Sequence, residues 1–122
     1  MKLHLQGGIP QRVTGTGPGW VRVNDVEHRQ NLVLTPDAVQ PGVAPGGFAG
    51  LGARDLAALL AHAPEIVLLG TGATQRFPHP ESTRALTDAQ VGVEVMDTPA
   101  ACRTYNILVA EGRRVVALLL VE

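Results

Sequence analysis

The chain contains 122 residues, a length that accommodates one globular domain but not two independent ones. Hydrophobic residues make up 45% of it and charged residues 17%, which excludes an intrinsically disordered chain and predicts a buried core. Ten Lys and Arg balance eleven Asp and Glu, with no basic cluster longer than Arg113-Arg114, so a surface for nucleic acid or anionic membranes is not expected.

The first third of the chain is predicted to form a β-hairpin or meander. Apolar and polar residues alternate at residues 12–14 and again over Trp20–Val23. Asn24-Asp25 supplies a turn, after which residues 27–34 continue the meander. Trp20 follows a cluster of glycines and is expected to anchor the core of the hairpin, with an exposed partner contact as the alternative.

The rest of the chain is predicted to alternate between helices and strands after a surface loop at residues 41–50, which are rich in Gly and Pro. The expected elements are a helix at 54–61, a strand at 65–69, a helix at 80–90, a strand at 93–96, a helix at 98–110 and a strand at 115–121. Thr98 is expected to cap the third helix, with Pro99 at its first position. This order predicts an α/β fold with crossover connections, in a single domain over residues 1–122.

Polar and glycine residues follow two of the predicted strands where each strand ends. Gly70-Thr71-Gly72 come after the first strand, and Asp97-Thr98 come after the second. If these strands run parallel, both groups converge at the carboxyl edge of the sheet, where open α/β sheets bind ligands. Further along the third helix, Arg103 and Asn106 share a face and are placed to hold an anion, or to pair with Asp97 and Glu94.

The same residues also have a purely structural interpretation. In that interpretation Thr98 caps the helix, Asp97 complements its dipole, and Arg103 makes an ordinary ion pair. The polar side chains then hold the helix to the sheet and have no ligand. The sequence leaves both interpretations open.

No catalytic constellation is recognisable in the sequence. Gln75 stands where a dinucleotide-binding loop would have its third glycine. Cys102 lies near a helix N-terminus but has no partner base, and its alanine neighbours favour a packed structural thiol. The histidines lie too far apart for a metal site: His4, His28, His62 and His79. We therefore expect no catalytic residue, no metal and no cofactor, and favour a protein that is not an enzyme.

Blocks of the second half occur in the order and spacing of a known family, at residues 68–72, 91–98, 100–108 and 111–115. In these blocks the chain resembles the Mth938-like family, a small domain of unknown function. That family includes a mitochondrial assembly factor of respiratory complex I and the adipogenesis-associated Mth938 domain-containing protein. The resemblance implies a single compact three-layer α/β domain, with a mixed β-sheet flanked by helices and an N-terminal β-hairpin.

The resemblance also implies a partner protein and no particular reaction. The residues that carry the family pattern form the candidate ligand or partner cleft: Gly70, Thr71, Gly72, Glu94, Asp97, Thr98, Arg103, Tyr105, Asn106 and Arg113. The first hypothesis is a non-catalytic protein-interaction or assembly-factor-type domain. The alternative is a binder of, or an enzyme acting on, a small anionic metabolite at this cleft.

Three further expectations concern location and association. The longest aliphatic run, residues 115–121, is too short to cross a bilayer, so we expect no membrane insertion. The lone cysteine suits a reducing compartment, and we expect a cytoplasmic protein. An unpaired edge strand of the hairpin allows a homodimer.

Overall fold

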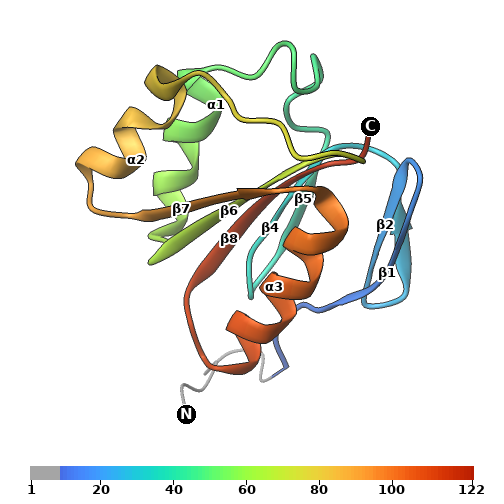
Figure 1. The fold of residues 1–122 in the computed structure, drawn as a ribbon. Coiled ribbons are helices and arrows are strands. Elements are labelled where there is room, and N and C mark those ends of the chain that lie inside the picture. The colour runs from blue at the N-terminus through green and yellow to red at the C-terminus, as the bar shows by residue number, and fades with distance from the viewer. Residues whose placement is uncertain (1–8) are drawn as a thin grey trace.

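The structure, a computed structural model, describes residues 9–122, and its strands form two sheets (Figure 1). The first is an antiparallel meander in the order β1-β2-β3. Its strands are β1 (Val13–Gly17), β2 (Trp20–Val23) and β3 (Val26–His28). The second is a mixed five-stranded sheet in the order β5-β4-β8-β6-β7. Its strands are β4 (Leu32–Leu34), β5 (Val39–Pro41), β6 (Ile66–Thr71), β7 (Gly92–Met96) and β8 (Val115–Leu120).

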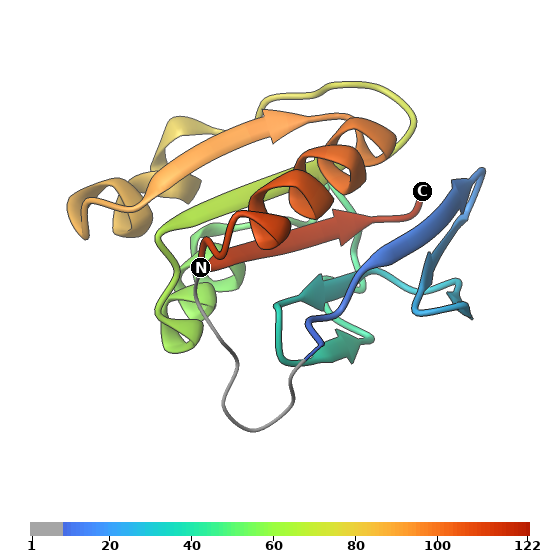
Figure 2. The same cartoon turned by 90° about the horizontal axis from the view of Figure 1, so that it is seen from below.

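Helices cover both faces of the five-stranded sheet, which gives the mixed α/β architecture that the sequence predicts (Figures 1 and 2). The long helix α3 lies over one face, beside the meander. The short helices α1 and α2 lie over the other face. The helical elements are α1 (Ala53–Ala57), a 3₁₀ helix η1 (Ala58–His62), a 3₁₀ helix η2 (Pro80–Thr83), α2 (Arg84–Asp88) and α3 (Thr98–Ala110).

The central strands β6 and β8 are buried along their whole length, as their uninterrupted apolar sequences predict. They run parallel to each other, and β6 also runs parallel to β7. Because successive side chains of a strand point to opposite faces of the sheet, alternate residues of β6 and β8 enter two different cores. One core lies between the sheet, α3 and the meander, and includes Tyr105. The other lies under α1 and α2, and includes Leu56 and Leu86.

Three parts of the sequence-based prediction need correction. Residues 32–34 are not part of the meander but form strand β4 of the large sheet, because all three side chains are buried and need cover on both faces. The helix expected at 54–61 is α-helical only over its first turn and continues as 3₁₀ helix, ending at Ala63 with a left-handed φ of 51°. The helix expected at 80–90 has the reverse order: it begins as the 3₁₀ helix η2 and continues as α2, which ends at Asp88.

Trp20 lies outside both cores, contrary to the prediction that it anchors the hairpin core. Its neighbours on the strand, Val21 and Val23, point into the core, so the twofold period of a strand turns Trp20 to the opposite face. There the indole packs on Gly17, which has no Cβ to obstruct it. The Arg22 guanidinium lies 4.7 Å from the ring centroid. Trp20 is thus half-buried on the outer face of the meander.

Candidate functional site

A cavity of about 310 Å³ lies between the tip of the β1–β2 hairpin and the carboxyl edge of the large sheet. We call it the hairpin–edge cavity. It is lined by Thr16, Gly17, Pro18, Gly19, Trp20, Gly72, Ala73, Thr98, Pro99, Leu120, Val121 and Glu122. Among the described residues, Glu122 is the only ionisable one in this lining. The cavity is therefore an apolar pocket with one acidic group, formed where β1, β6 and β8 end and where β2 and α3 begin.

Thr98 joins the strand ends that form the floor of this cavity. Its hydroxyl accepts a hydrogen bond from the Gly72 backbone N–H at 2.8 Å and donates one to the Leu120 carbonyl at 2.5 Å. Its own N–H donates to the Gly72 carbonyl at 2.8 Å. Gly72 has a left-handed φ of 94°, and a Cβ there would lie 2.8 Å from the Glu122 carbonyl oxygen. The close approach of these ends therefore requires both the threonine and the glycine.

Asp97, and not Thr98, caps helix α3, which corrects the sequence-based prediction. The Asp97 carboxylate accepts a hydrogen bond from the Ala100 N–H at 2.8 Å, and Thr98 is already the first helical residue. The threonine hydroxyl is unavailable as a cap because it bonds to the sheet. The negative charge of Asp97 also complements the positive end of the helix dipole.

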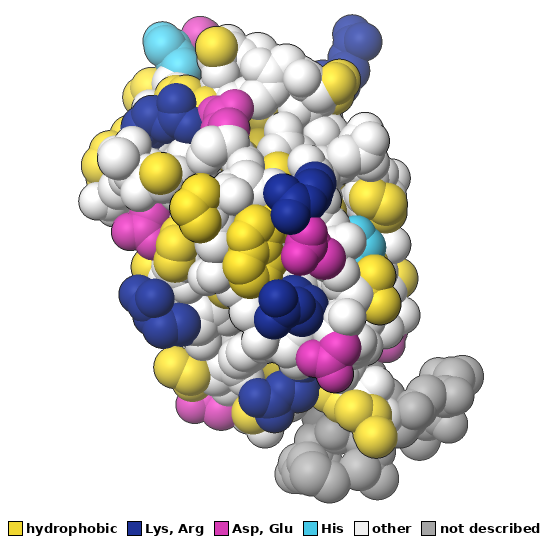
Figure 3. Space-filling view, turned by 90° about the vertical axis from the view of Figure 1, so that its right-hand side faces the viewer, with side chains coloured by type: hydrophobic (Ala, Val, Ile, Leu, Met, Phe, Trp, Pro, Cys, Tyr) yellow, Lys and Arg dark blue, Asp and Glu magenta, His cyan; other side chains and the backbone are white. Residues whose placement is uncertain are grey.

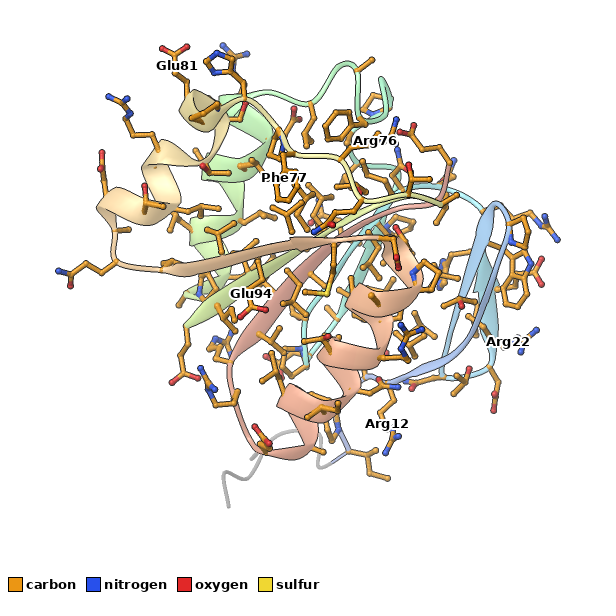
Figure 4. The ribbon with its side chains drawn as sticks, viewed as in Figure 1. Arg12, Arg22, Arg76, Phe77, Glu81 and Glu94 are labelled. Atoms are coloured by element: carbon orange, nitrogen blue, oxygen red, sulfur yellow. The ribbon has the colours of Figure 1, made fainter. Side chains whose placement is uncertain are left out.

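Thr71 and Arg76 close one side of the carboxyl edge. The Thr71 hydroxyl donates to the Thr74 carbonyl at 2.6 Å and accepts from the Arg76 N–H at 3.0 Å. The Arg76 guanidinium donates to the Thr71 carbonyl at 2.7 Å, pairs with the Glu122 carboxylate, and lies 4.5 Å from the centroid of the Phe48 ring (Figure 4). A hydrogen bond from the Phe48 N–H, with a smaller contribution from Arg76, lowers the pKa of Glu122. The positive charge of Arg76 is thus already paired within the protein.

Tyr105 and Asn106 lie away from the cavity and attach the meander to α3. The Asn106 side-chain amide accepts from the Val13 N–H at 2.9 Å and donates to the Val13 carbonyl at 2.8 Å. The Tyr105 hydroxyl donates to the Gln11 carbonyl at 2.9 Å, and burial raises its pKa. Burial also raises the pKa of the Cys102 thiol to about 12, which agrees with a packed structural cysteine.

The remaining candidate residues are separated from one another. Glu94 is exposed on β7 (Figure 4). Arg103 is exposed on α3. Arg113 lies at the opposite end of β8 from the cavity, with its Nε 3.4 Å from the Glu65 carboxylate. The structure thus brings together Gly70, Thr71, Gly72, Asp97 and Thr98, and places Glu94, Arg103, Tyr105, Asn106 and Arg113 elsewhere.

The sequence-based prediction misses the half of the cavity that the hairpin tip and residues 121–122 provide. The adjacent Pro18 and Gly19 are the only local signal for it, since proline and glycine together mark a turn. The face that carries the meander shows apolar side chains interspersed with charges of both signs (Figure 3).

Neither a metal-binding group of side chains nor a membrane-spanning helix is found within residues 9–122. No group of three or more His, Cys, Asp and Glu side chains in that range is placed to hold a metal ion. His4, one of the histidines considered above, lies outside the described residues. No helix in the same range is long and apolar enough to cross a membrane.

Two solved structures define the class of fold. A crystal structure of a Bordetella parapertussis protein superposes with a TM-score of 0.84 at 42% identity, covering 93% of this chain and 98% of the other. A solution structure from Bordetella pertussis, described as a Mth938-like domain, gives a TM-score of 0.78 at 37% identity, covering 98% of this chain and 92% of the other. The chain therefore has the Mth938-like fold that the sequence resemblance predicts.

The family follows from the sequence over nearly the same range. The family model described as "Protein of unknown function (DUF498/DUF598)" matches residues 13–120, and the chain belongs to this family. An uncharacterised protein of Rhodobacter capsulatus is 38% identical over 116 residues, which cover 93% of this chain and 86% of that protein.

More distant relatives carry informative names. The zebrafish protein "NADH dehydrogenase [ubiquinone] 1 alpha subcomplex assembly factor 3" is 36% identical over 88 residues, which cover 72% of this chain and 51% of that protein. A Francisella tularensis protein named "13 kDa major membrane protein" is 40% identical over 62 residues, which cover 51% of this chain and 50% of that protein. The chain thus spans about half the length of each of these two relatives.

Proposed function

We propose that this chain is a non-catalytic protein-interaction domain of the assembly-factor type, which binds an apolar side chain of a partner protein in the hairpin–edge cavity. The cavity carries this proposal, because its lining combines Trp20, Pro18 and Pro99 with glycine backbone, and Glu122 is its one ionisable side chain within residues 9–122. Apolar pockets of this kind receive the anchor side chains of protein interfaces. In this proposal residues 1–122 act as a single domain.

The names of relatives support the same class of function. The zebrafish relative is named as an assembly factor of NADH dehydrogenase. Within the proposal, the partner of this chain is a protein undergoing assembly, and a respiratory-complex subunit is the first one to test.

The anionic-metabolite alternative is weaker, because the groups that would bind an anion are already bonded. Asp97 occupies the N-terminus of α3, and the hydroxyls of Thr71 and Thr98 bond to backbone atoms. No Lys or Arg among residues 9–122 lines the cavity, and Arg103 stands apart from it on the exposed face of the helix. The positive charge of Arg76 is already paired with Glu122, so an anion in the cavity would meet an acidic side chain and no free cation among the described residues.

The proposal is tested by filling the cavity from its mouth. Ala73 is exposed and lines the cavity, so Ala73→Phe places a ring in the space that the partner would occupy. Ala110→Phe is the matched control, since Ala110 is also exposed but lies at the other end of α3. Tagged wild type, both variants and Arg103→Ala are expressed in the native host, and proteins that copurify after gentle crosslinking are identified by mass spectrometry.

We expect wild type, Ala110→Phe and Arg103→Ala to recover one partner near stoichiometry, and Ala73→Phe to lose it. Failure of wild type to recover a specific protein would argue against an interaction domain, and full recovery by Ala73→Phe would argue against this cavity. The proposal places the interaction in the cytoplasm, and fractionation of the same cells tests that location against the membrane location that the Francisella name suggests.

A further inference from the structure

The outer side of helix α3 has an apolar centre. At about 100° per residue, Ile107 lies about 200° around the helix from the buried Tyr105, so it points away from the sheet. Ile107 is 59% exposed. On the same side Ala110 is exposed and Ala100 is half-buried. No described helix or strand lies over them (Figures 1 and 2). A helix on the surface of a protein usually turns polar side chains outward, so the centre of this side departs from the usual pattern.

Two opposite charges flank this isoleucine at equal distances. Arg103 precedes it by four residues and Glu111 follows it by four, and residues four apart lie on the same side of a helix. Both are exposed, and neither side chain forms an ion pair within residues 9–122. They are about 12 Å apart along the helix axis, too far to pair with each other. Each charge is therefore available to a group on another molecule.

We infer that this side of α3 binds the same side of α3 in a second copy of the chain, with the two helices antiparallel and a two-fold axis at Ile107. We call the surface the α3 face; it consists of Ala100, Arg103, Ile107, Ala110 and Glu111. In this arrangement Ile107 meets Ile107 of the second copy. Arg103 of each copy stands opposite Glu111 of the other, so two ion pairs form. A surface that is complementary to itself in this way is what a closed two-fold dimer requires.

The arrangement agrees with the way helices pack. Arg103, Ile107 and Glu111 form one ridge of residues four apart, inclined by about 26° to the helix axis. When two such helices cross at about 50°, the commonest class of packing, their ridges run alongside each other. Ala110 lies in the next ridge, and its small side chain leaves a groove beside Ile107 for the isoleucine of the second copy. The two arginines are then about 12 Å apart, beyond the Debye length of about 8 Å at physiological salt.

The two charges also distinguish a second copy from other occupants of the α3 face. An anionic membrane surface would attract Arg103 but repel Glu111, and an apolar bilayer interior would leave both charges without a partner. A second copy neutralises both of them with groups that the chain itself supplies. The α3 face contains none of the residues that line the hairpin–edge cavity, so this inference goes beyond the proposed function and does not depend on it.

Reversing the two charges tests the register. Arg103→Glu gives an α3 face with two acidic groups and Glu111→Arg gives one with two basic groups, so each variant repels a second copy of itself. The double variant carries both changes and keeps the net charge of wild type. Arg84→Glu is the matched control, because Arg84 is exposed on α2, over the opposite face of the sheet. Sedimentation equilibrium is measured for each protein, with circular dichroism as the check that each is folded.

We expect wild type and Arg84→Glu to form a weak dimer with a dissociation constant of about 0.1 mM, since one helix from each copy makes a small interface. Arg103→Glu and Glu111→Arg should each raise this constant about tenfold, because two attractions become two repulsions. The double variant should return to within about threefold of wild type. An equimolar mixture of the two single variants should also associate like wild type, since each then meets its opposite charges.

Three results would overturn the inference. A wild type that stays monomeric up to ~1 mM would exclude a second copy as the occupant of the α3 face. Single variants that dimerise like wild type would show that another surface carries the dimer, and so would a mixture that does not restore association. Ile107→Ala tests the centre independently, since alanine favours the helix and should raise the dissociation constant about tenfold; an unchanged constant would contradict the contact between the two isoleucines. None of these variants alters the hairpin–edge cavity, so the failure of this inference and that of the proposed function are distinguishable.

Discussion

Replacing Asn106 with Ala should loosen the meander from the rest of the protein. The Asn106 amide bonds both backbone groups of Val13, at 2.9 and 2.8 Å, and Val13 is only 8% exposed. Loss of the amide leaves one N–H and one carbonyl without their partner, each at a cost of about 1–3 kcal/mol when fully buried. Because these bonds are only partly buried, we expect Asn106→Ala to lower the free energy of unfolding by about 2–3 kcal/mol in total.

Urea denaturation followed by circular dichroism measures this change, and a fall of about 10 °C in Tm should accompany it. Arg103→Ala is the control, because an exposed side chain on the same helix should change stability by less than about 0.5 kcal/mol. In Asn106→Ala the Val13 amide should also exchange faster with solvent than in wild type. A loss of stability no larger than that of the control would refute the role assigned to the amide in holding the meander.

Three further predictions concern the carboxyl edge and the buried thiol. Thr98→Val removes the hydroxyl that bonds two backbone groups and should cost about 2 kcal/mol in denaturant unfolding, whereas Thr98→Ser should retain most of the stability. Cys102, with a pKa of about 12, should resist iodoacetamide at pH 8 in the folded protein and react once urea unfolds it; labelling at equal rates would contradict its burial. The lowered pKa of Glu122 means that its ionised form stabilises the fold at neutral pH and that this contribution is lost as the pH falls through the lowered pKa. The side chain is 38% exposed, so Glu122→Gln should reduce the stability difference between neutral and acidic pH by less than ~1 kcal/mol, and a larger acid dependence in the variant than in wild type would reverse the assignment.

The carboxyl edge illustrates how one set of polar residues can be read in two ways. Thr71, Asp97 and Thr98 do meet at the ends of parallel strands, as the sequence predicts. Their hydrogen bonds, however, run to backbone atoms of the protein itself. The structural interpretation of these three residues therefore agrees with their contacts, and the space for a partner lies beside them in the apolar cavity.

The sequence alone was sufficient wherever the decisive interactions are local. The apolar runs at β6 and β8 predict strands buried on both faces, and the Asp97-Thr98-Pro99 start with Gly112 beyond the end predicts α3 almost to the residue. The turn at Asn24-Asp25 also follows directly from residues that tolerate the left-handed φ they adopt there.

Only the tertiary structure decided which distant segments meet. The Val13 partner of Asn106 lies 93 residues away in the chain, and the hairpin–edge cavity combines the tip at residues 16–20 with residues 72–73, 98–99 and 120–122. No local pattern specifies such pairs, because they depend on how two sheets and a helix pack together. The long separation also explains why Tyr105 and Asn106 look like ligand residues in the sequence, yet in the structure they bind the protein's own backbone, at Gln11 just before the first strand and at Val13 within it.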